Sequence, residues 1–152
     1  MIQVAFPEPS FRLKRQDGRE YIFDSIRRRW LQLTEEEWVR QNFINYLVQV
    51  LGYPASLIAV EKGIRVGELS KRFDILVYDR HHRPWMLVEC KRPGQDLAEE
   101  VLLQALRYHL SVPACLVVIT NGSRTMGWEK TGSVLRPLDR LPAWSETGPG
   151  PE

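Results

Sequence analysis

The sequence predicts a single domain of the α/β class, in which two helices flank a mixed β-sheet. Its 152 residues match the usual length of one domain, and 43% of them are hydrophobic, enough for a packed core. The elements follow in the order helix, three strands, helix, strand, which is typical of α/β or α+β domains, and we choose α/β. The apolar run 114–119 is continuous rather than alternating, which suits a central strand covered on both faces. Disordered, collagen-like and coiled-coil chains are excluded by this composition.

The charge balance of the chain is close to neutral. Lys and Arg number 21 and Asp and Glu number 19, a net charge of +2. Such a balance argues against a protein that coats nucleic acid over its whole surface, although it leaves room for local patches. No uninterrupted apolar stretch approaches the ~18 residues of a membrane helix, so we expect a soluble, cytoplasmic protein without membrane contact.

The first 33 residues are locally basic, with seven Lys and Arg against four Asp and Glu. Residues 11–14 and 21–23 alternate in polarity around the turn 16–18, which predicts a small hairpin. Two groups of cations in this segment are either solvated charge or patches that contact phosphates: residues 27–29, and Arg12, Lys14 and Arg15.

The clearest helix is predicted over residues 34–51. Thr34 is a suitable N-cap, and Glu37 three residues later completes a capping box. From Trp38 to Leu51, apolar side chains recur at spacings of three and four, which indicates one buried stripe. Gly52 and Pro54 then end the helix.

Strands and a second helix follow this first helix. The strands are predicted at 57–60, 73–78, 85–90 and 114–119, and the helix at about 96–110. The pattern weakens after residue 122, where we expect short edge strands at 126–128 and 134–135 and a frayed tail at 145–152. Cys90 and Cys115 each lie in an apolar run, which predicts two buried free thiols.

Three ionisable residues lie within or directly after apolar strands: Asp74, Glu89 and Lys91. Carboxylates are rarely buried unless they are paired or bound to metal. A hairpin centred on residues 81–82 places residue 74 opposite residue 89, with Cβ atoms ~4.5–5.5 Å apart, and alternation puts Lys91 on the face of Glu89. Two carboxylates that close repel each other unless a cation or proton lies between them, and Mg²⁺ is the natural candidate.

The same residues also have a purely structural interpretation. Glu89 and Lys91 could form an exposed pair on an edge strand, and Asp74 could pair with Arg72 at the surface. The surrounding apolar runs and the matching register favour the functional interpretation.

The order of Asp74, Glu89 and Lys91 across a strand hairpin resembles the PD-(D/E)XK nuclease core. A wider set of motifs resembles, more specifically, the N-terminal nuclease domain of type I restriction enzyme R subunits and its small stand-alone relatives. These motifs are Thr34-x-x-Glu37-x-x-Arg40-Gln41, residues 51–54, Val60-Glu61, residues 72–78, residues 87–93, Gln104-x-x-x-Tyr108 and residues 119–122. The resemblance implies a restriction-endonuclease-like core over about residues 30–122. A basic hairpin (1–30) and the edge strands with the tail (123–152) complete a single domain 1–152.

The resemblance implies a role for each matching residue. Asp74 and Glu89 would hold Mg²⁺, with Mn²⁺ as a substitute, Lys91 would be the catalytic lysine, and Glu37 would be an additional acidic residue at the same site. The residues implied to contact DNA are Gln104, Tyr108, Arg40 and Arg92. One departure is that Phe73 stands where the superfamily has its proline.

Several of these residues have a simpler explanation. Glu37 also serves as the third residue of a capping box. Gln104 and Tyr108 are i,i+4 neighbours that could pack on a helix surface. The three histidines lack zinc-ligand spacing.

The function expected from the sequence is Mg²⁺-dependent hydrolysis of DNA phosphodiesters, with DNA as the partner and a homodimer or further protein partners left open. No phosphate loop is present, so we expect no motor in this chain. The alternative is a non-catalytic module that keeps the nuclease fold and binds nucleic acid or protein. A third possibility is a metal-dependent enzyme that acts on another phosphate substrate.

Overall fold

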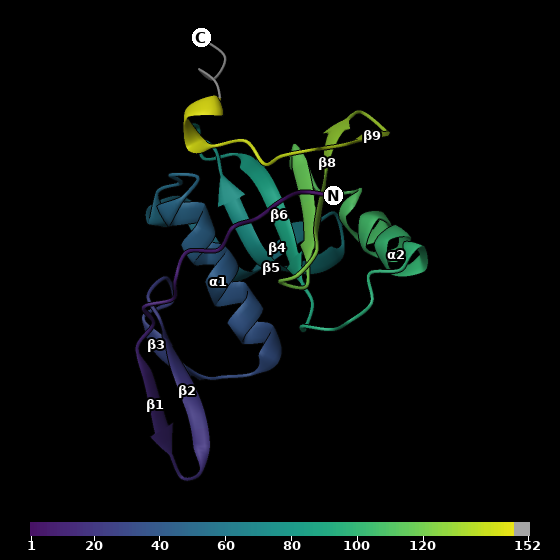
Figure 1. The fold of residues 1–152 in the computed structure, drawn as a ribbon. Coiled ribbons are helices and arrows are strands. Elements are labelled where there is room, and N and C mark those ends of the chain that lie inside the picture. Colours follow the sequence, from purple (N-terminus) through teal and green to yellow (C-terminus); the bar gives the residue numbers. More distant parts are fainter. Residues whose placement is uncertain (148–152) are drawn as a thin grey trace.

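The structure, a computed structural model, describes residues 1–147 and contains two sheets and two α-helices. The smaller sheet is formed by β1 (Leu13–Gln16), β2 (Arg19–Asp24) and β3 (Arg29–Gln32), all antiparallel. It projects beyond the N-terminal end of helix α1 (Glu35–Gln49), to which β3 leads directly (Figure 1). The predicted hairpin is thus confirmed, and a third strand is added to it.

The larger sheet has six strands in the order in which they occur in the chain. They are β4 (Ile58–Val66), β5 (Leu69–Tyr78), β6 (Pro84–Cys90), β7 (Leu116–Thr120), β8 (Thr125–Thr131) and β9 (Val134–Pro137). Only β6 and β7 pair in parallel, and helix α2 (Glu99–His109) lies in the connection between them. The mixed sheet with flanking helices confirms the predicted α/β class.

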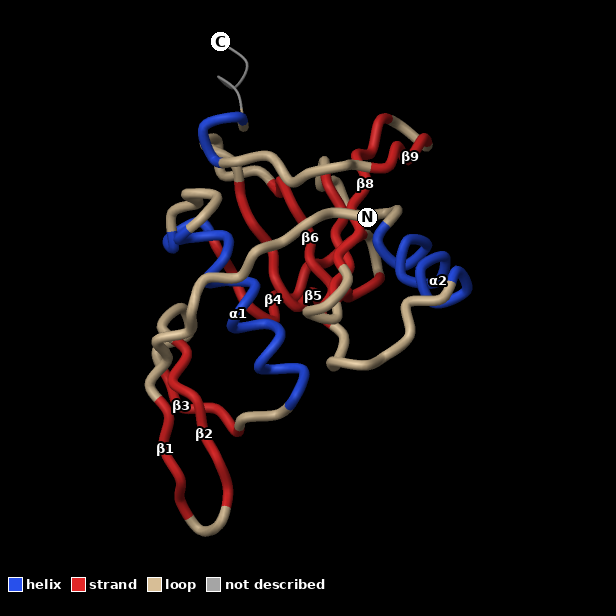
Figure 2. Tube along the Cα trace, viewed as in Figure 1, coloured by secondary structure: helices blue, strands red, loops and turns tan. Residues whose placement is uncertain are grey.

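The two helices lie on opposite sides of this sheet (Figure 2). Phe43 and Leu47 of α1 pack with Ile75, Val88 and Val118 of the central strands in the main core. Apolar side chains of this kind stabilise the fold by about 1.5–3 kcal/mol each when fully buried. A smaller core lies on the α2 side and contains Phe73, Leu76, Leu87, Val112 and Ala114.

The boundaries of several elements differ from the prediction. Strand β4 runs well past residue 60. The prediction missed this extension because Lys62 and Gly63 interrupt the apolar pattern. Helix α1 ends at Gln49, so Val50 is left exposed. Short 3₁₀ turns occur at Ala55–Leu57 and Trp144–Glu146, and the latter occupies the start of the predicted frayed tail, whose remainder (148–152) lies outside the described residues.

One thiol prediction is confirmed and the other is wrong. Cys90 is buried at the end of β6, whereas Cys115 is exposed. Cys115 precedes β7, which begins at Leu116, so the core does not cover its side chain. None of the helices within residues 1–147 is long and apolar enough to cross a membrane.

Candidate active site

Strands β5 and β6 carry the three residues that the sequence singled out. Ile75 pairs with Val88 and Leu76 with Leu87, the register that brings residue 74 to residue 89. Strand β6 lies between β5 and β7, so the interpretation of an exposed pair on an edge strand is wrong. Arg72 contacts Glu61 instead of Asp74.

The carboxylate of Asp74 is held by two donors from different parts of the fold. Nη2 of Arg40 donates to Oδ1 at 2.9 Å, and the backbone N–H of Cys90 donates to Oδ2 at 2.7 Å. Burial and the nearby charge of Glu89 nevertheless raise the pKa of Asp74 above its usual value. The site therefore holds this carboxylate in place while its charge is only partly compensated.

Glu89 is turned toward helix α2. Its Oε1 lies 3.3 Å from Nζ of Lys91, and its Oε2 lies 3.4 Å from Nε2 of His109. Burial raises the pKa of Glu89, but His109 and Lys91 outweigh burial and lower the pKa below its usual value. His109 is 1% exposed, and neither of its ring nitrogens has a hydrogen-bond partner within the described residues.

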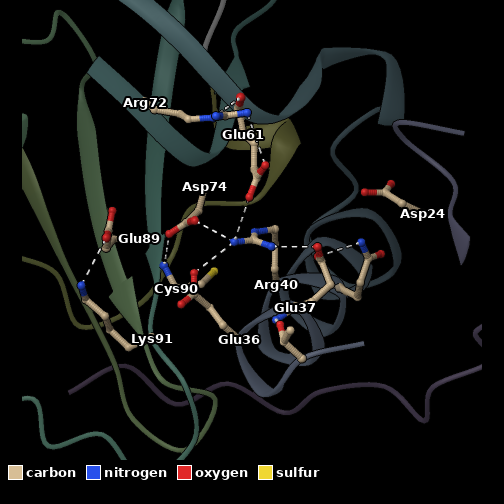
Figure 3. A network of polar contacts seen from close by, with 12 residues as sticks. Asp24, Glu36, Glu37, Arg40, Glu61, Arg72, Asp74, Glu89, Cys90 and Lys91 are labelled. Carbon is tan, nitrogen blue, oxygen red and sulfur yellow. Dashed lines mark hydrogen bonds and ion pairs between the residues drawn. The ribbon is translucent and has the colours of Figure 1, made fainter. Parts of the chain in front are cut away.

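Arg40 connects helix α1 to the strands. Its guanidinium contacts four carboxylates: Glu37 and Asp74 at 2.9 Å, Glu36 at 3.1 Å and Glu61 at 3.5 Å. Although burial opposes the charge, Asp74 and Glu37 raise the pKa of Arg40 above its ordinary value. Figure 3 shows Asp74 between Glu89 and this arginine. The Arg40 side chain is only 5% exposed and lies inside this network.

Glu37 is both a cap residue and a member of the same network. Its backbone N–H donates to Oγ1 of Thr34 at 3.0 Å, which confirms the cap. Its carboxylate contacts Arg27 and Arg40, each at 2.9 Å, and it meets Asp74 only through Arg40. Burial and the charges of Asp74 and Glu89 raise the pKa of Glu36, the preceding residue of the helix.

Two clefts border these residues. A cleft of about 350 Å³ joins Glu89 and Lys91 to Gln104, Tyr108 and His109 of α2. The structure therefore brings Gln104 and Tyr108, both exposed, beside the strand residues as the sequence suggested. The hydroxyl of Tyr108 also accepts a hydrogen bond from the backbone of Arg72 at 3.1 Å.

The second cleft, of about 610 Å³, opens between the small sheet and the start of α1. Gln32 of β3, Glu36 of α1 and exposed Arg92 line it. Arg40 also lines this cleft, so both arginines predicted to contact DNA border it, Arg92 exposed and Arg40 largely buried.

The donor set at the strands fits a hard divalent cation. Mg²⁺ is bound in proteins by one or two carboxylates, with waters and substrate phosphates completing its shell. Asp74 and Glu89 supply two such carboxylates, and burial together with the charge of Glu89 raises the pKa of Asp74. Within residues 1–147, no group of three His, Cys, Asp or Glu side chains is placed to hold a metal ion. The candidate ligands for an ion are therefore the two carboxylates of Asp74 and Glu89.

Sequence reasoning missed His109 and Glu36. His109 contacts Glu89 from the end of α2, and no spacing of residues in the sequence predicts that contact. Glu36 is one position away from the residue that the motif selects, and only the rotation of α1 distinguishes the two.

The fold, the paired carboxylates and the adjacent lysine define a nuclease-like domain. Residues 35–142 match the family described as type I restriction enzyme R protein N terminus (HSDR_N), and the chain belongs to this family. This match confirms the resemblance inferred from the motifs. No curated protein matches the chain. Among solved structures, the type IIG restriction endonuclease BpuSI is similar, with a TM-score of 0.43 and 19% identity, over 62% of this chain and 11% of that chain.

Proposed function

We propose that the chain hydrolyses phosphodiester bonds of DNA in a reaction that requires Mg²⁺, for which Mn²⁺ can substitute. The observation that carries this proposal is the placement of Asp74 and Glu89 on paired strands, with Lys91 beside Glu89 at 3.3 Å. Membership in a restriction-enzyme family supports DNA as the substrate. The family thus supports DNA as the substrate and partner, and the residues support the chemistry.

In the proposed reaction, Asp74 and Glu89 would hold the ion. When bound, the ion supplies positive charge to the phosphate and lowers the pKa of a coordinated water. Lys91 is 26% exposed, so its ammonium can reach a phosphate in the cleft and stabilise the negative charge that develops there. A water oxygen forms a new bond to phosphorus, and the bond from phosphorus to the leaving sugar oxygen breaks.

The contacts of Arg40 and Lys91 give these residues different tasks. Arg40 orients the carboxylate of Asp74 and balances part of its charge through the 2.9 Å contact. Lys91 faces the cleft that Gln104 and Tyr108 border, where the DNA backbone would lie. Gln104 and Tyr108 would position the substrate by hydrogen bonds to phosphates or sugars.

The test is cleavage of supercoiled and linear plasmid with Mg²⁺, Mn²⁺ or EDTA. We expect metal-dependent cleavage by the wild type and a loss of at least ~100-fold in Lys91→Ala, since a removed transition-state donor costs about that much. Lys62→Ala, which changes an exposed lysine on β4, is the matched control and should cleave normally. No metal-dependent cleavage, or equal activity of both variants, would refute the proposal.

One observation favours the second candidate, a non-catalytic module that keeps the fold. Both oxygens of Asp74 already accept hydrogen bonds, so an ion would have to share Oδ1 with Arg40 or Oδ2 with the backbone N–H of Cys90. Such a module would bind DNA without cleaving it and would bind it equally well after Lys91→Ala. The cleavage and binding assays together separate the two candidates.

A further inference from the structure

The small sheet carries cations and aromatic rings on one face. The register pairs Lys14 with Tyr21, Tyr21 with Gln32, and Phe23 with Trp30. Opposed residues share a face of a sheet, and their neighbours along each strand point to the other face. We call this surface the ring face: Arg12, Lys14, Gln16, Arg19, Tyr21, Phe23, Trp30 and Gln32. None of these described side chains is acidic, and the buried Ile22 and Asp24 lie on the opposite side.

The cations of the ring face lie over the rings. The Cζ atom of Arg12 is 4.7 Å from the ring centre of Phe23 and 5.3 Å from that of Trp30. Nζ of Lys14 lies 4.4 Å from the Trp30 ring centre and 5.8 Å from that of Tyr21. The two cations are exposed and the rings are partly buried. The face therefore presents positive charges interleaved with partly buried aromatic rings.

One edge of the ring face, at Gln32, borders the cleft at the start of α1, which Arg29 and Leu31 of the opposite face also line. Gln32 belongs to this face and also lines the cleft of about 610 Å³ that contains Glu36 and Arg92. At its other side, Arg12 and Phe23 line a second groove of about 300 Å³ against α1. A polymer lying on the face can thus extend past Gln32 into the cleft that contains Glu36 and Arg92.

We propose that the ring face binds a single-stranded segment of nucleic acid, with DNA as the substrate class. This inference rests on the proposed nuclease function for the identity of the polymer. Proteins that bind single strands combine a positive surface with aromatic side chains on which bases stack. In a duplex the bases are already stacked on one another, so the rings would gain nothing and only the cations would contribute. The interleaving of rings and cations, without a carboxylate, therefore favours the single strand.

The experiment measures binding in EDTA, where hydrolysis does not occur. A fluorescein-labelled oligothymidylate and a duplex of equal length are titrated with the full chain, and anisotropy gives the dissociation constants. We expect tighter binding of the single strand. Lys14→Glu should weaken that binding about tenfold, and Trp30→Ala by a similar factor, the cost of one lost stacking or charge contact. Binding should also weaken steeply with added salt.

The matched control is Arg15→Glu. Arg15 is the next residue on the same strand, is exposed and points to the opposite face, where it is paired with Glu20. The charge change is identical, so equal losses in Lys14→Glu and Arg15→Glu would overturn the inference. A preference for duplex, or an unchanged affinity in Lys14→Glu, would also overturn it. Circular dichroism checks the fold of Trp30→Ala, and Lys14→Glu decides the question if that variant unfolds.

The binding assay and the cleavage assay test the ring-face inference and the nuclease proposal separately. Lys62→Ala should bind the oligonucleotide as tightly as the wild type does, because Lys62 is exposed on β4 and lies outside the ring face and the candidate active site. If no chain cleaves DNA but Lys14→Glu still loses binding, the nuclease proposal is wrong and the ring-face inference holds. If the wild type cleaves DNA but Lys14→Glu binds the single strand normally, the ring-face inference is wrong.

Discussion

Asp24 and Asp74 are two aspartates of low exposure that each contact an arginine, yet their surroundings move their pKa values in opposite directions. Asp24 lies at the end of β2, is 0% exposed and accepts three hydrogen bonds: from the backbone N–H groups of Ile26 and Arg27 at 2.8 and 3.0 Å, and from Nε of Arg27 at 2.5 Å. Burial works against the charge, but the hydrogen bonds and the charge of Arg27 lower the pKa of Asp24.

Asp74 has fewer donors and a carboxylate neighbour. It accepts one hydrogen bond from Arg40 and one from the backbone, and burial together with Glu89 raises its pKa. The comparison teaches that an arginine contact alone does not make a carboxylate structural. The turn after β2 is built to satisfy a charge, whereas the strand site accumulates negative charge that a cation would relieve.

The largest expected effect comes from neutralising Asp24, whose carboxylate accepts three hydrogen bonds. Asp24→Asn should lower the free energy of unfolding by about 2–3 kcal/mol, because it removes charge-assisted hydrogen bonds and leaves Arg27 without this partner. Urea denaturation at neutral pH measures this loss. Asp17→Asn, in the exposed turn between β1 and β2, is the matched control and should change stability little. Equal stabilities of Asp24→Asn and wild type would show that this carboxylate is not structural.

The pH dependence of the same variant sharpens the contrast. The folded pKa of Asp24 lies below its unfolded value, so its stabilising contribution is present above the unfolded pKa of ~3.9 and is lost as pH falls through the folded value. The difference in unfolding free energy between wild type and Asp24→Asn should therefore shrink as the pH is lowered below about 4. A difference that stays constant down to the acid limit would contradict the assigned pKa direction.

Neutralising Asp74 should raise the stability of the fold, whereas neutralising Asp24 should lower it. The folded pKa of Asp74 is raised, so its ionised form costs stability that appears as pH rises through the unfolded value. In EDTA at neutral pH, Asp74→Asn should melt a few degrees higher than the wild type. Arg40 retains Glu36, Glu37 and Glu61 as partners in this variant.

With magnesium present, the wild type should melt at a higher temperature than Asp74→Asn. An ion that binds only the folded state raises the melting temperature of the wild type with concentration, and Asp74→Asn should lose this response. Asp24→Asn, although less stable, should keep it, since its residue lies outside the ion site. A magnesium response retained in Asp74→Asn would remove Asp74 from the proposed ligands.

These contrasts also mark what sequence could and could not predict. The placement of Asp74 opposite Glu89, with Lys91 nearby, could be predicted because it depends on strand alternation and on one hairpin register, both of which are local. Strand β3 was missed because three arginines precede Trp30, and the tight turn before it places Arg28 at a φ of 55°, a conformation that glycine usually marks. The contacts of Arg40 and His109 depend on how α1 and α2 lie against the sheet, which no local pattern contains.

The smallest expected effect concerns His109, which lies behind Glu89. Residues that touch a metal ligand typically change metal affinity by about 10–100-fold when replaced. His109→Leu keeps the size and burial of the side chain but removes the nitrogen that lies 3.4 Å from Glu89. We expect the fold to survive, because neither ring nitrogen has a hydrogen bond to lose, and the magnesium concentration for half-maximal thermal stabilisation to rise about tenfold. His81→Leu, in the exposed turn before β6, should leave that concentration unchanged. If His109→Leu left the magnesium concentration for half-maximal thermal stabilisation unchanged, His109 would be only a packing residue. Lys91 would then be the neighbour that keeps Glu89 ionised.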